Sequence, residues 1–139
     1  MKYYVLLGGP EHLEYFQNPT KIKDEQWWWT VSPSAKIGET AFIYLTAPES
    51  RIVGRVELIG EPFHNVANIF ENQKCDGKWM APIGNVVYYP PRPELTMKGL
   101  RSLFGSDWAW LSYPRGKTTI PDHILTPFLE LVETANEGR

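Results

Sequence analysis

Three clusters of aromatic residues carry the side chains best suited to hold a flat ligand. If residues 26–31 form a strand, Trp27 and Trp29 point to one face and Trp28 points to the other. One core layer cannot bury all three rings, so at least one ring should fill a second core layer, an interface or a pocket that stacks on a nucleobase. Core packing is the alternative for each tryptophan taken singly. The clusters are Trp27–Trp29, Trp79 with Tyr88 and Tyr89, and Trp108 with Trp110 and Tyr113.

Motifs that would support catalysis or metal binding are missing from the sequence. Lys117 and Thr118 resemble the end of a phosphate-binding loop, but the first glycine of that motif falls on Leu111. The three histidines lie in different predicted elements and lack the spacing of metal ligands. No serine lies in a Gly-x-Ser-x-Gly elbow, and no pair of carboxylates demands acid–base chemistry. We therefore expect a protein that is not an enzyme and that uses no metal and no cofactor.

Composition narrows the class of protein further. The chain has 139 residues, and we expect residues 1–139 to form a single domain. A net charge of -2 and a pI near 5.9 argue against binding that depends on neutralising many phosphates. The single cysteine, Cys75, and the lack of a long apolar run predict a cytoplasmic protein. A group of basic residues is either a local positive rim or ordinary solvated surface: Arg92, Lys98, Arg101, Arg115 and Lys117.

Short strands must position the aromatic clusters. Apolar periodicity and turn residues predict strands at residues 3–7, 27–31, 40–46, 51–59, 79–89 and 108–113, with a turn or short strand at 114–120. Helices are expected after Pro10, from Asn65, and over residues 94–104 with Leu103 on the buried face. A further helical region after Pro121 should break at Pro127. Because most neighbouring strands are too close for helical crossovers, the pattern predicts an α+β fold, a curved and mostly antiparallel β-barrel flanked by short helices.

An ordered set of short motifs resembles the EVE domain. A tryptophan strand, Trp29-Thr30-Val31, is followed by Lys36-Ile37-Gly38-Glu39, which is similar to the family's turn of basic, apolar, glycine and acidic residues. Next come an apolar strand with Tyr44 and the Val-Gly strand Ile52-Val53-Gly54-Arg55-Val56. Residues 113–119 resemble the turn before the last helix of the family. Each motif is short, but their order and spacing agree over nearly the whole chain.

The resemblance implies both a fold and a function. EVE domains belong to the PUA-like superfamily, with the YTH and ASCH domains as relatives, so a PUA-like barrel is implied. The implied function is a nucleic-acid-binding module that recognises a modified nucleobase, either flipped or single-stranded, in an aromatic pocket. Its implied partners are DNA or RNA carrying a modified base and other proteins of a restriction or RNA-modification system, with no membrane partner.

The same resemblance assigns the site residues. Trp29 best matches the tryptophan of the family pocket, and Trp28 is the alternative if the register slips by one residue. Gly8 and Gly9 are expected to border the pocket. The remaining assignments are Ser32 and Tyr44 as hydrogen-bonding groups at the base edge, Trp79 as pocket or core, and Arg115 and Lys117 as contacts to the nucleic-acid backbone.

Two other functions stay open at this point. Some ASCH relatives are small enzymes that act on nucleosides or RNA, so a hydrolase using Lys117, Glu57 or Tyr44 is the first alternative. The second is an interaction domain whose exposed tryptophans bind another protein.

Overall fold

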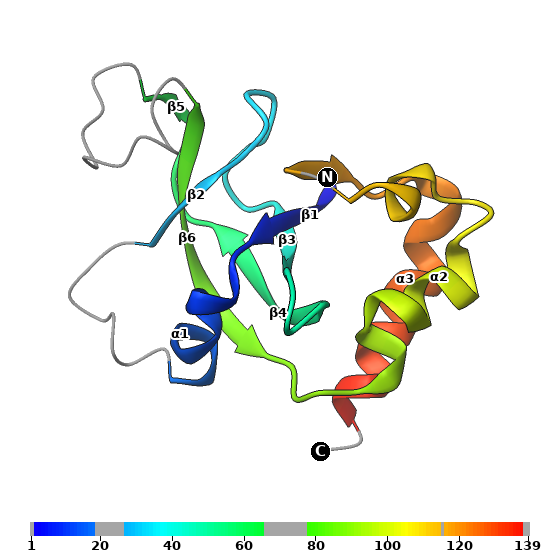
Figure 1. Ribbon diagram of the computed structural model, residues 1–139. Coiled ribbons are helices and arrows are strands. Elements are labelled where there is room, and N and C mark those ends of the chain that lie inside the picture. Colours follow the sequence, from blue (N-terminus) through cyan, green and yellow to red (C-terminus); the bar gives the residue numbers. More distant parts are fainter. Residues whose placement is uncertain (1, 19–26, 66–77, 115, 138–139) are drawn as a thin grey trace.

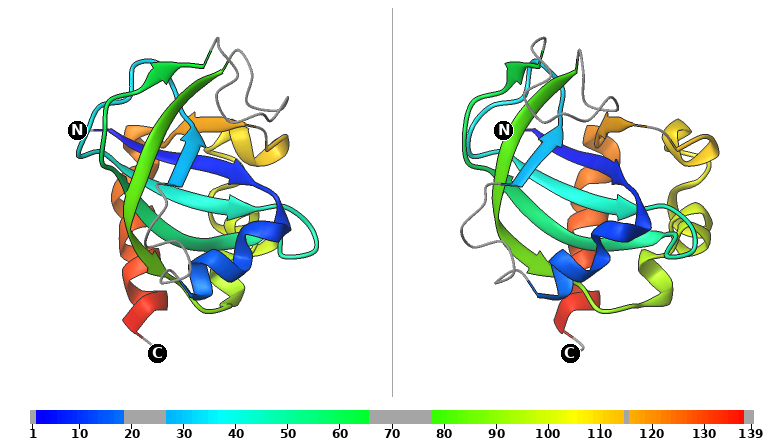
Figure 2. Two further views of the ribbon diagram at one scale, coloured as in Figure 1. Left: turned by 90° about the vertical axis from the view of Figure 1, so that its left-hand side faces the viewer. Right: turned by 60° about the vertical axis from the view of Figure 1, so that its left-hand side comes forward.

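A curled seven-stranded sheet forms the centre of the computed structural model, which describes residues 2–18, 27–65, 78–114 and 116–137 (Figures 1 and 2). The strand order is β2-β6-β4-β3-β1-β7, with β5 paired to β6. Only the β1–β3 pair is parallel among the described strands, so the predicted α+β fold with a curved, mostly antiparallel sheet is confirmed, and the sheet curls into a half-barrel. The strands are β1 Tyr3–Gly8, β2 Trp27–Thr30, β3 Thr40–Leu45, β4 Arg51–Leu58, β5 Phe63–His64, β6 Trp79–Tyr88 and β7 Lys117–Thr119.

The central strands are buried on both faces because side chains on the two sides of the sheet pack into two separate cores. On the helix-side core, Val5 and Phe42 pack with residues of α2 (Met97–Phe104) and α3 (Asp122–Glu137). On the inner core, Leu6 and Ile43 pack with Phe16 of α1 (Leu13–Gln17). Figure 1 shows α2 and α3 together on one side of the sheet and α1 on the other. This double burial explains the nearly continuous apolar runs of β1 and β3.

Local irregularities give the sheet its curl. The predicted hairpin of β3 and β4 is confirmed, and its register shifts between Ile43 and Tyr44. The β4–β6 pair shifts again between Arg55 and Glu57, opposite Asn85, whose φ is 51°. An unpaired extra residue bends a strand and increases its twist, so these shifts fold β6 and β2 over the inner core. Figure 2 shows β2 passing over β1, and the side chain of Trp29 on β2 reaches Leu7 near the end of β1.

Residues 108–113 do not form the predicted strand. They form a short 3-10 helix, η4 (Ala109–Ser112), in which the N–H of Leu111 donates to the carbonyl of Trp108 at 3.1 Å. Trp108 and Leu111 are both buried in the helix-side core. A spacing of three residues puts both side chains on one side of a 3-10 turn, whereas a strand would place them on opposite faces.

Two helices also differ from expectation. The predicted helix over 94–104 is divided at Thr96, which ends η3 (Pro93–Leu95) and caps α2 by accepting from the N–H of Gly99 at 3.1 Å. Leu103 is exposed on α2 instead of buried. The expected break at Pro127 is absent, since α3 runs through it. Burial of Phe128 and other α3 residues, each contributing about 1.5–3 kcal/mol, offsets a proline cost of about 3 kcal/mol.

The other expected helices are settled only in part. The helix after Pro10 is confirmed as η1 (Pro10–His12) followed by α1. The helix proposed from Asn65, with Val66, Ile69 and Phe70 on one face, lies outside the described residues.

Within the part of the chain that the structure describes, no helix combines the length and apolarity needed to cross a membrane.

Candidate functional site

A pocket of about 470 Å³ opens at the edge of the half-barrel, between β2 and the end of β1. This edge pocket takes its walls from three segments that are far apart in sequence, because the curl of the sheet brings the first and last parts of its strand order together. Its volume lies in the range of small-molecule sites. The lining residues are Leu7, Gly8 and Gly9 from β1 and the turn after it, Glu11 and His12 from η1, Trp28, Trp29 and Thr30 from β2, and Lys78 and Met80 at the start of β6.

Trp29 forms a fixed wall of the edge pocket. Its indole Nε1 donates to the carbonyl of Leu7 at 3.0 Å, which ties β2 to the end of β1. Its ring also contacts His12, with 5.0 Å between ring centroids, and meets Phe16 edge-on. Only 9% of Trp29 is exposed. The ring is therefore held in one orientation before any ligand arrives.

Gly8 leaves the space that the Trp29 ring fills. A Cβ atom at Gly8 would lie 2.5 Å from Cζ2 and 2.9 Å from Cη2 of Trp29, well inside van der Waals contact. The absence of a side chain at this position therefore allows β1 and the indole to approach closely.

Trp28 offers the more accessible indole of the pocket. It is half-buried, and its ring meets Phe63 of β5 edge-on with 5.2 Å between centroids. Next to it, the hydroxyl of Thr30 lies 3.4 Å from the sulfur of Met80. The side chain of Trp27 lies outside the described residues.

Polar groups that sequence reasoning missed complete the edge pocket. Glu11 and His12 of η1 lie close together, with 3.6 Å between Oε1 and Nε2, and the Glu11 side chain is 67% exposed. Lys78 is also exposed at the mouth. The sequence held one usable signal: Pro10 predicts a helical turn directly after the glycines, and such a turn returns Glu11 and His12 toward the end of β1.

The predicted base-binding residues divide into two groups. Gly8, Gly9, Trp28 and Trp29 come together in the edge pocket. The structure does not bring Ser32, Tyr44 or Trp79 into it. They occupy three other places.

Each of these three residues lies in a different environment. Ser32 lines a separate hollow of about 190 Å³ with Tyr4 and residues of β7. Tyr44 points into the helix-side core against Trp110, and burial raises the pKa of its hydroxyl. Trp79 stacks on His64 with a ring angle of 3°.

The predicted backbone-binding and hydrolytic residues are also separated. Lys117 is exposed on β7, and Arg115 lies outside the described residues. Glu57 of β4 accepts a hydrogen bond from Asn85 at 3.1 Å. Lys117, Glu57 and Tyr44, proposed for a hydrolase, therefore do not line the edge pocket.

Most of the suggested positive rim lies away from the edge pocket. Lys98 and Arg101 belong to α2, across the sheet from β2 (Figure 1). Nε of Arg101 donates to the carbonyl of Leu111 at 2.8 Å, so this side chain braces η4.

A buried carboxylate anchors the turn that leads into β3. Glu39 accepts hydrogen bonds from the backbone N–H groups of Lys2 and Lys36 and from the hydroxyl of Tyr4. Burial alone would raise the pKa of Glu39, but these hydrogen bonds outweigh it and lower that pKa. Burial and the adjacent carboxylate raise the pKa of Tyr4 to about 12. Gly38 allows the turn because its φ is 90°.

Within the described ranges, no three His, Cys, Asp or Glu side chains gather as a metal-ligand set. The residues that line the edge pocket offer aromatic faces for stacking, hydrogen-bonding groups and a small number of charges.

By sequence, the chain matches no protein-family model and no curated protein. By structure, it is similar to a hypothetical protein from Leishmania major, with a TM-score of 0.72 and 12% identity over 100% of this chain and 98% of the other. It is similar to human THYN1 in complex with 5-methylcytosine-containing DNA, with a TM-score of 0.68 and 13% identity over 96% and 98% of the two chains.

A mutant of the ASCH protein ZmASCH from Zymomonas mobilis is also similar, with a TM-score of 0.63 and 12% identity over 94% of this chain and 99% of the other. Identities this low establish a shared fold and nothing finer. The PUA-like fold predicted from the ordered motifs is thereby confirmed, as is the resemblance to EVE and ASCH domains at the level of the fold.

Proposed function

We propose that this protein binds a modified nucleobase of a DNA or RNA strand in the edge pocket and does not act on it chemically. The observation that carries the proposal is the fixed ring of Trp29 beside the more accessible ring of Trp28 at the mouth of a ligand-sized pocket. A flat base that enters this pocket meets aromatic and apolar surface without an ordering cost at Trp29.

The two tryptophans have different roles in this proposal. Trp28 provides the stacking face because its ring is half-buried, whereas nearly all of Trp29 is covered. Trp29 is the rigid wall that limits the size and tilt of the bound ring. Base stacking on an aromatic side chain contributes roughly 1–3 kcal/mol per base.

Glu11 gives the pocket a preference among bases. A carboxylate accepts hydrogen bonds from the exocyclic amino group of cytosine or adenine, and it repels the carbonyl oxygen that thymine and uracil present in its place. Glu11 is exposed and already folds against Gly9 at the pocket. We therefore expect a modified cytosine or adenine to bind better than a modified uracil.

The fold likeness supports nucleic acid as the ligand. THYN1, which shares the fold over nearly its whole length, is seen bound to DNA that contains 5-methylcytosine. That protein makes 5-methyldeoxycytidine the first nucleoside to try, followed by N6-methyladenosine and the unmodified forms of both.

The test is a titration of nucleosides against the intrinsic fluorescence of the tryptophans, repeated by calorimetry. Trp28→Ala should weaken binding by roughly 5- to 150-fold, the equivalent of 1–3 kcal/mol of stacking. Trp79→Ala is the matched control, because Trp79 is a half-buried tryptophan that stacks on His64 outside the pocket. If no nucleoside binds, or if Trp79→Ala is as damaging as Trp28→Ala, the assignment of the pocket is wrong.

Incubation of the wild-type protein with acylated nucleosides and RNA tests the hydrolase alternative. We expect no product, since the three residues proposed for hydrolysis do not meet in the edge pocket. Product that disappears in Lys117→Ala would replace the binding proposal with an enzymatic one.

A further inference from the structure

A second aromatic pocket of about 470 Å³ lies beside β7 and η4. Trp110 and Tyr113 supply its rings, and Lys117 and Thr118 supply its polar side. Trp110 is held in place, with its ring stacked 5.4 Å from that of Trp108 and edge-on to Tyr44 at 6.1 Å. Tyr113 is 71% exposed. A fixed ring, an exposed ring and a cation form a second surface suited to a flat anionic ligand.

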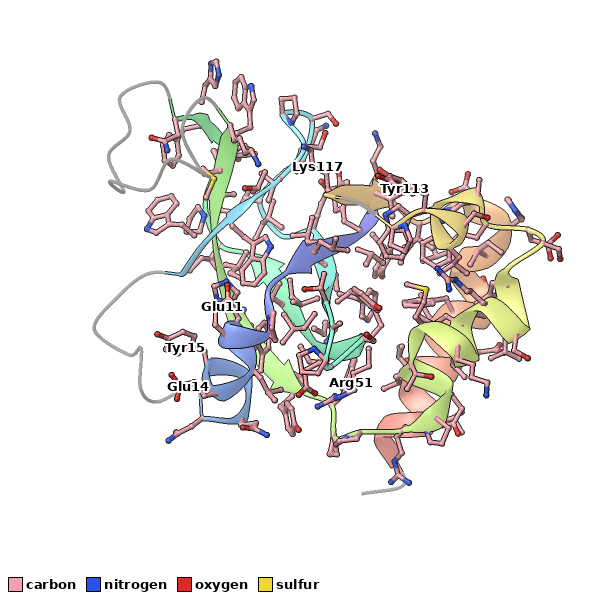
Figure 3. All side chains as sticks on the ribbon, viewed as in Figure 1. Glu11, Glu14, Tyr15, Arg51, Tyr113 and Lys117 are labelled. Atoms are coloured by element: carbon pink, nitrogen blue, oxygen red, sulfur yellow. The ribbon has the colours of Figure 1, made fainter. Side chains whose placement is uncertain are left out.

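Strand β1 connects this flanking pocket to the edge pocket. The N–H of Leu7, which lines the edge pocket, donates to the carbonyl of Gly116 at 2.8 Å, and Lys117 pairs with Leu6 in the next position. Leu6 and Gly8 are two residues apart, which is about 7 Å along a strand. Figure 3 shows Glu11 after the end of β1 and Lys117 on β7, the strand that pairs with β1.

A third hollow, of about 190 Å³, shares Lys117 and Thr118 with the flanking pocket and suits a phosphate. Ser32, Thr118 and Thr119 line it together with Lys117, so three hydroxyl-bearing side chains lie around one ammonium group. Lys117 lines both this hollow and the flanking pocket. Hydroxyl groups and a lysine are common contacts to nucleic-acid phosphates.

We propose that the flanking pocket holds a second nucleotide of the same strand, with its base between Trp110 and Tyr113 and the intervening phosphate at Lys117. This inference rests on the proposed function of the edge pocket and extends it. It makes the ligand a single-stranded or locally opened segment, because a base that stacks on protein rings has left its duplex stack. The low net charge of the protein agrees with a binding mode that uses stacking and few phosphates.

The experiment compares a modified nucleoside with a nine-nucleotide strand that carries the same base at its centre. Abasic sites placed one at a time on either side of that base locate the second nucleotide. For the wild-type protein, one flanking abasic site should lower affinity by roughly tenfold, as loss of one stacked base predicts. Tyr113→Leu should remove that dependence and weaken the strand by a similar factor, whereas Tyr113→Phe should retain it.

Lys117 is tested through the dependence of binding on salt. Lys117→Ala should lower the slope of log affinity against log salt by about 0.7, the value for one phosphate contact on a single strand. Lys98→Ala is the matched control, because Lys98 is an exposed lysine on α2 that lines neither the edge pocket nor the flanking pocket.

The outcomes separate the two proposals. If the nucleoside binds in a Trp28-dependent manner but Tyr113→Leu and Lys117→Ala leave strand affinity unchanged, the flanking site is refuted and the edge pocket stands. That result would also be expected if the flanking pocket served a peptide. If no nucleoside binds but strand affinity depends on Tyr113, the edge-pocket proposal fails and the second stacking site remains.

Discussion

Replacing Gly8 by alanine tests whether the Trp29 ring is held where the structure places it. The new Cβ would lie 2.5 Å from Cζ2 of Trp29 and 3.1 Å from Cδ2 of Leu45, against an optimum of about 3.5–4.0 Å between carbon atoms. The indole cannot swing away freely because it is bonded to the carbonyl of Leu7 and packed against His12 and Phe16.

The magnitude follows from the cost of overpacking a rigid site. One extra methyl in a filled space costs about 1–3 kcal/mol when neighbours must shift. For a chain of 139 residues, each kcal/mol corresponds to about 3–4 °C in Tm, so Gly8→Ala should melt roughly 3–12 °C below wild type. Nucleoside binding should weaken in parallel, since the displaced ring is a wall of the pocket.

Gly9→Ala is the control at the adjacent position. Gly9 has φ -82° and ψ 162°, which alanine adopts readily, and the atoms nearest to its new Cβ belong to the carboxylate end of Glu11. That side chain is exposed and can move, so stability should stay within about 0.5 kcal/mol of wild type. Thermal denaturation followed by near-UV circular dichroism measures both variants. Equal Tm values for Gly8→Ala and Gly9→Ala would refute the close packing of Trp29 on β1.

Three further predictions concern stability. Glu39→Ala should lower the free energy of unfolding by about 1–3 kcal/mol in denaturant titrations, because it leaves the buried Tyr4 hydroxyl and two backbone N–H groups without their acceptor. A decrease of less than about 0.5 kcal/mol would contradict this role of Glu39. The lowered pKa of Glu39 contributes stability that is present above its ordinary pKa of 4.5 and is lost as pH falls through the folded value. The raised pKa of Tyr4 contributes stability that is present below pH 10 and is lost as pH rises toward about 12. Denaturation measured across this pH range should show both losses of stability, and the alkaline loss should be smaller in Tyr4→Phe. Pro127→Ala should raise the free energy of unfolding by about 1–3 kcal/mol, since Pro127 is exposed inside α3 and alanine restores a backbone hydrogen bond. A decrease in the free energy of unfolding would show instead that the proline is needed for packing.

Strand positions were predictable wherever local pattern and packing agree. The hairpin of residues 40–46 and 51–59 follows from apolar runs and an intervening turn, and β3 and β4 confirm it. The 3-10 turn at Ala109–Ser112 was not predictable in the same way, because aromatic residues also favour strands. The predicted helix break at Pro127 was wrong for a related reason. The cost of a proline inside a helix is known from the sequence, but the burial of α3 side chains that offsets this cost exists only in the folded protein.

The candidate site was predictable in part. Trp28, Trp29, Gly8 and Gly9 were all named from the sequence, and the structure places them around one pocket. Tyr44 and Trp79 are also aromatic residues on strands, yet Tyr44 faces the helix-side core and Trp79 stacks on His64. The face on which a strand residue lies depends on register and bulges, and a shift of one residue reverses it.

The sequence by itself determined the kind of chemistry that this protein has available. Rings in excess of one core layer and a low net charge indicate binding by stacking and local polar contacts. Only the tertiary structure decided which rings meet. The curl of the sheet brings β2 close to the end of β1, so the indole of Trp29 reaches the carbonyl of Leu7. It also places Glu11 and Lys78 on the lining of the same pocket. Those contacts depend on bulges and long-range pairing, which the spacing of residues along the chain does not encode locally.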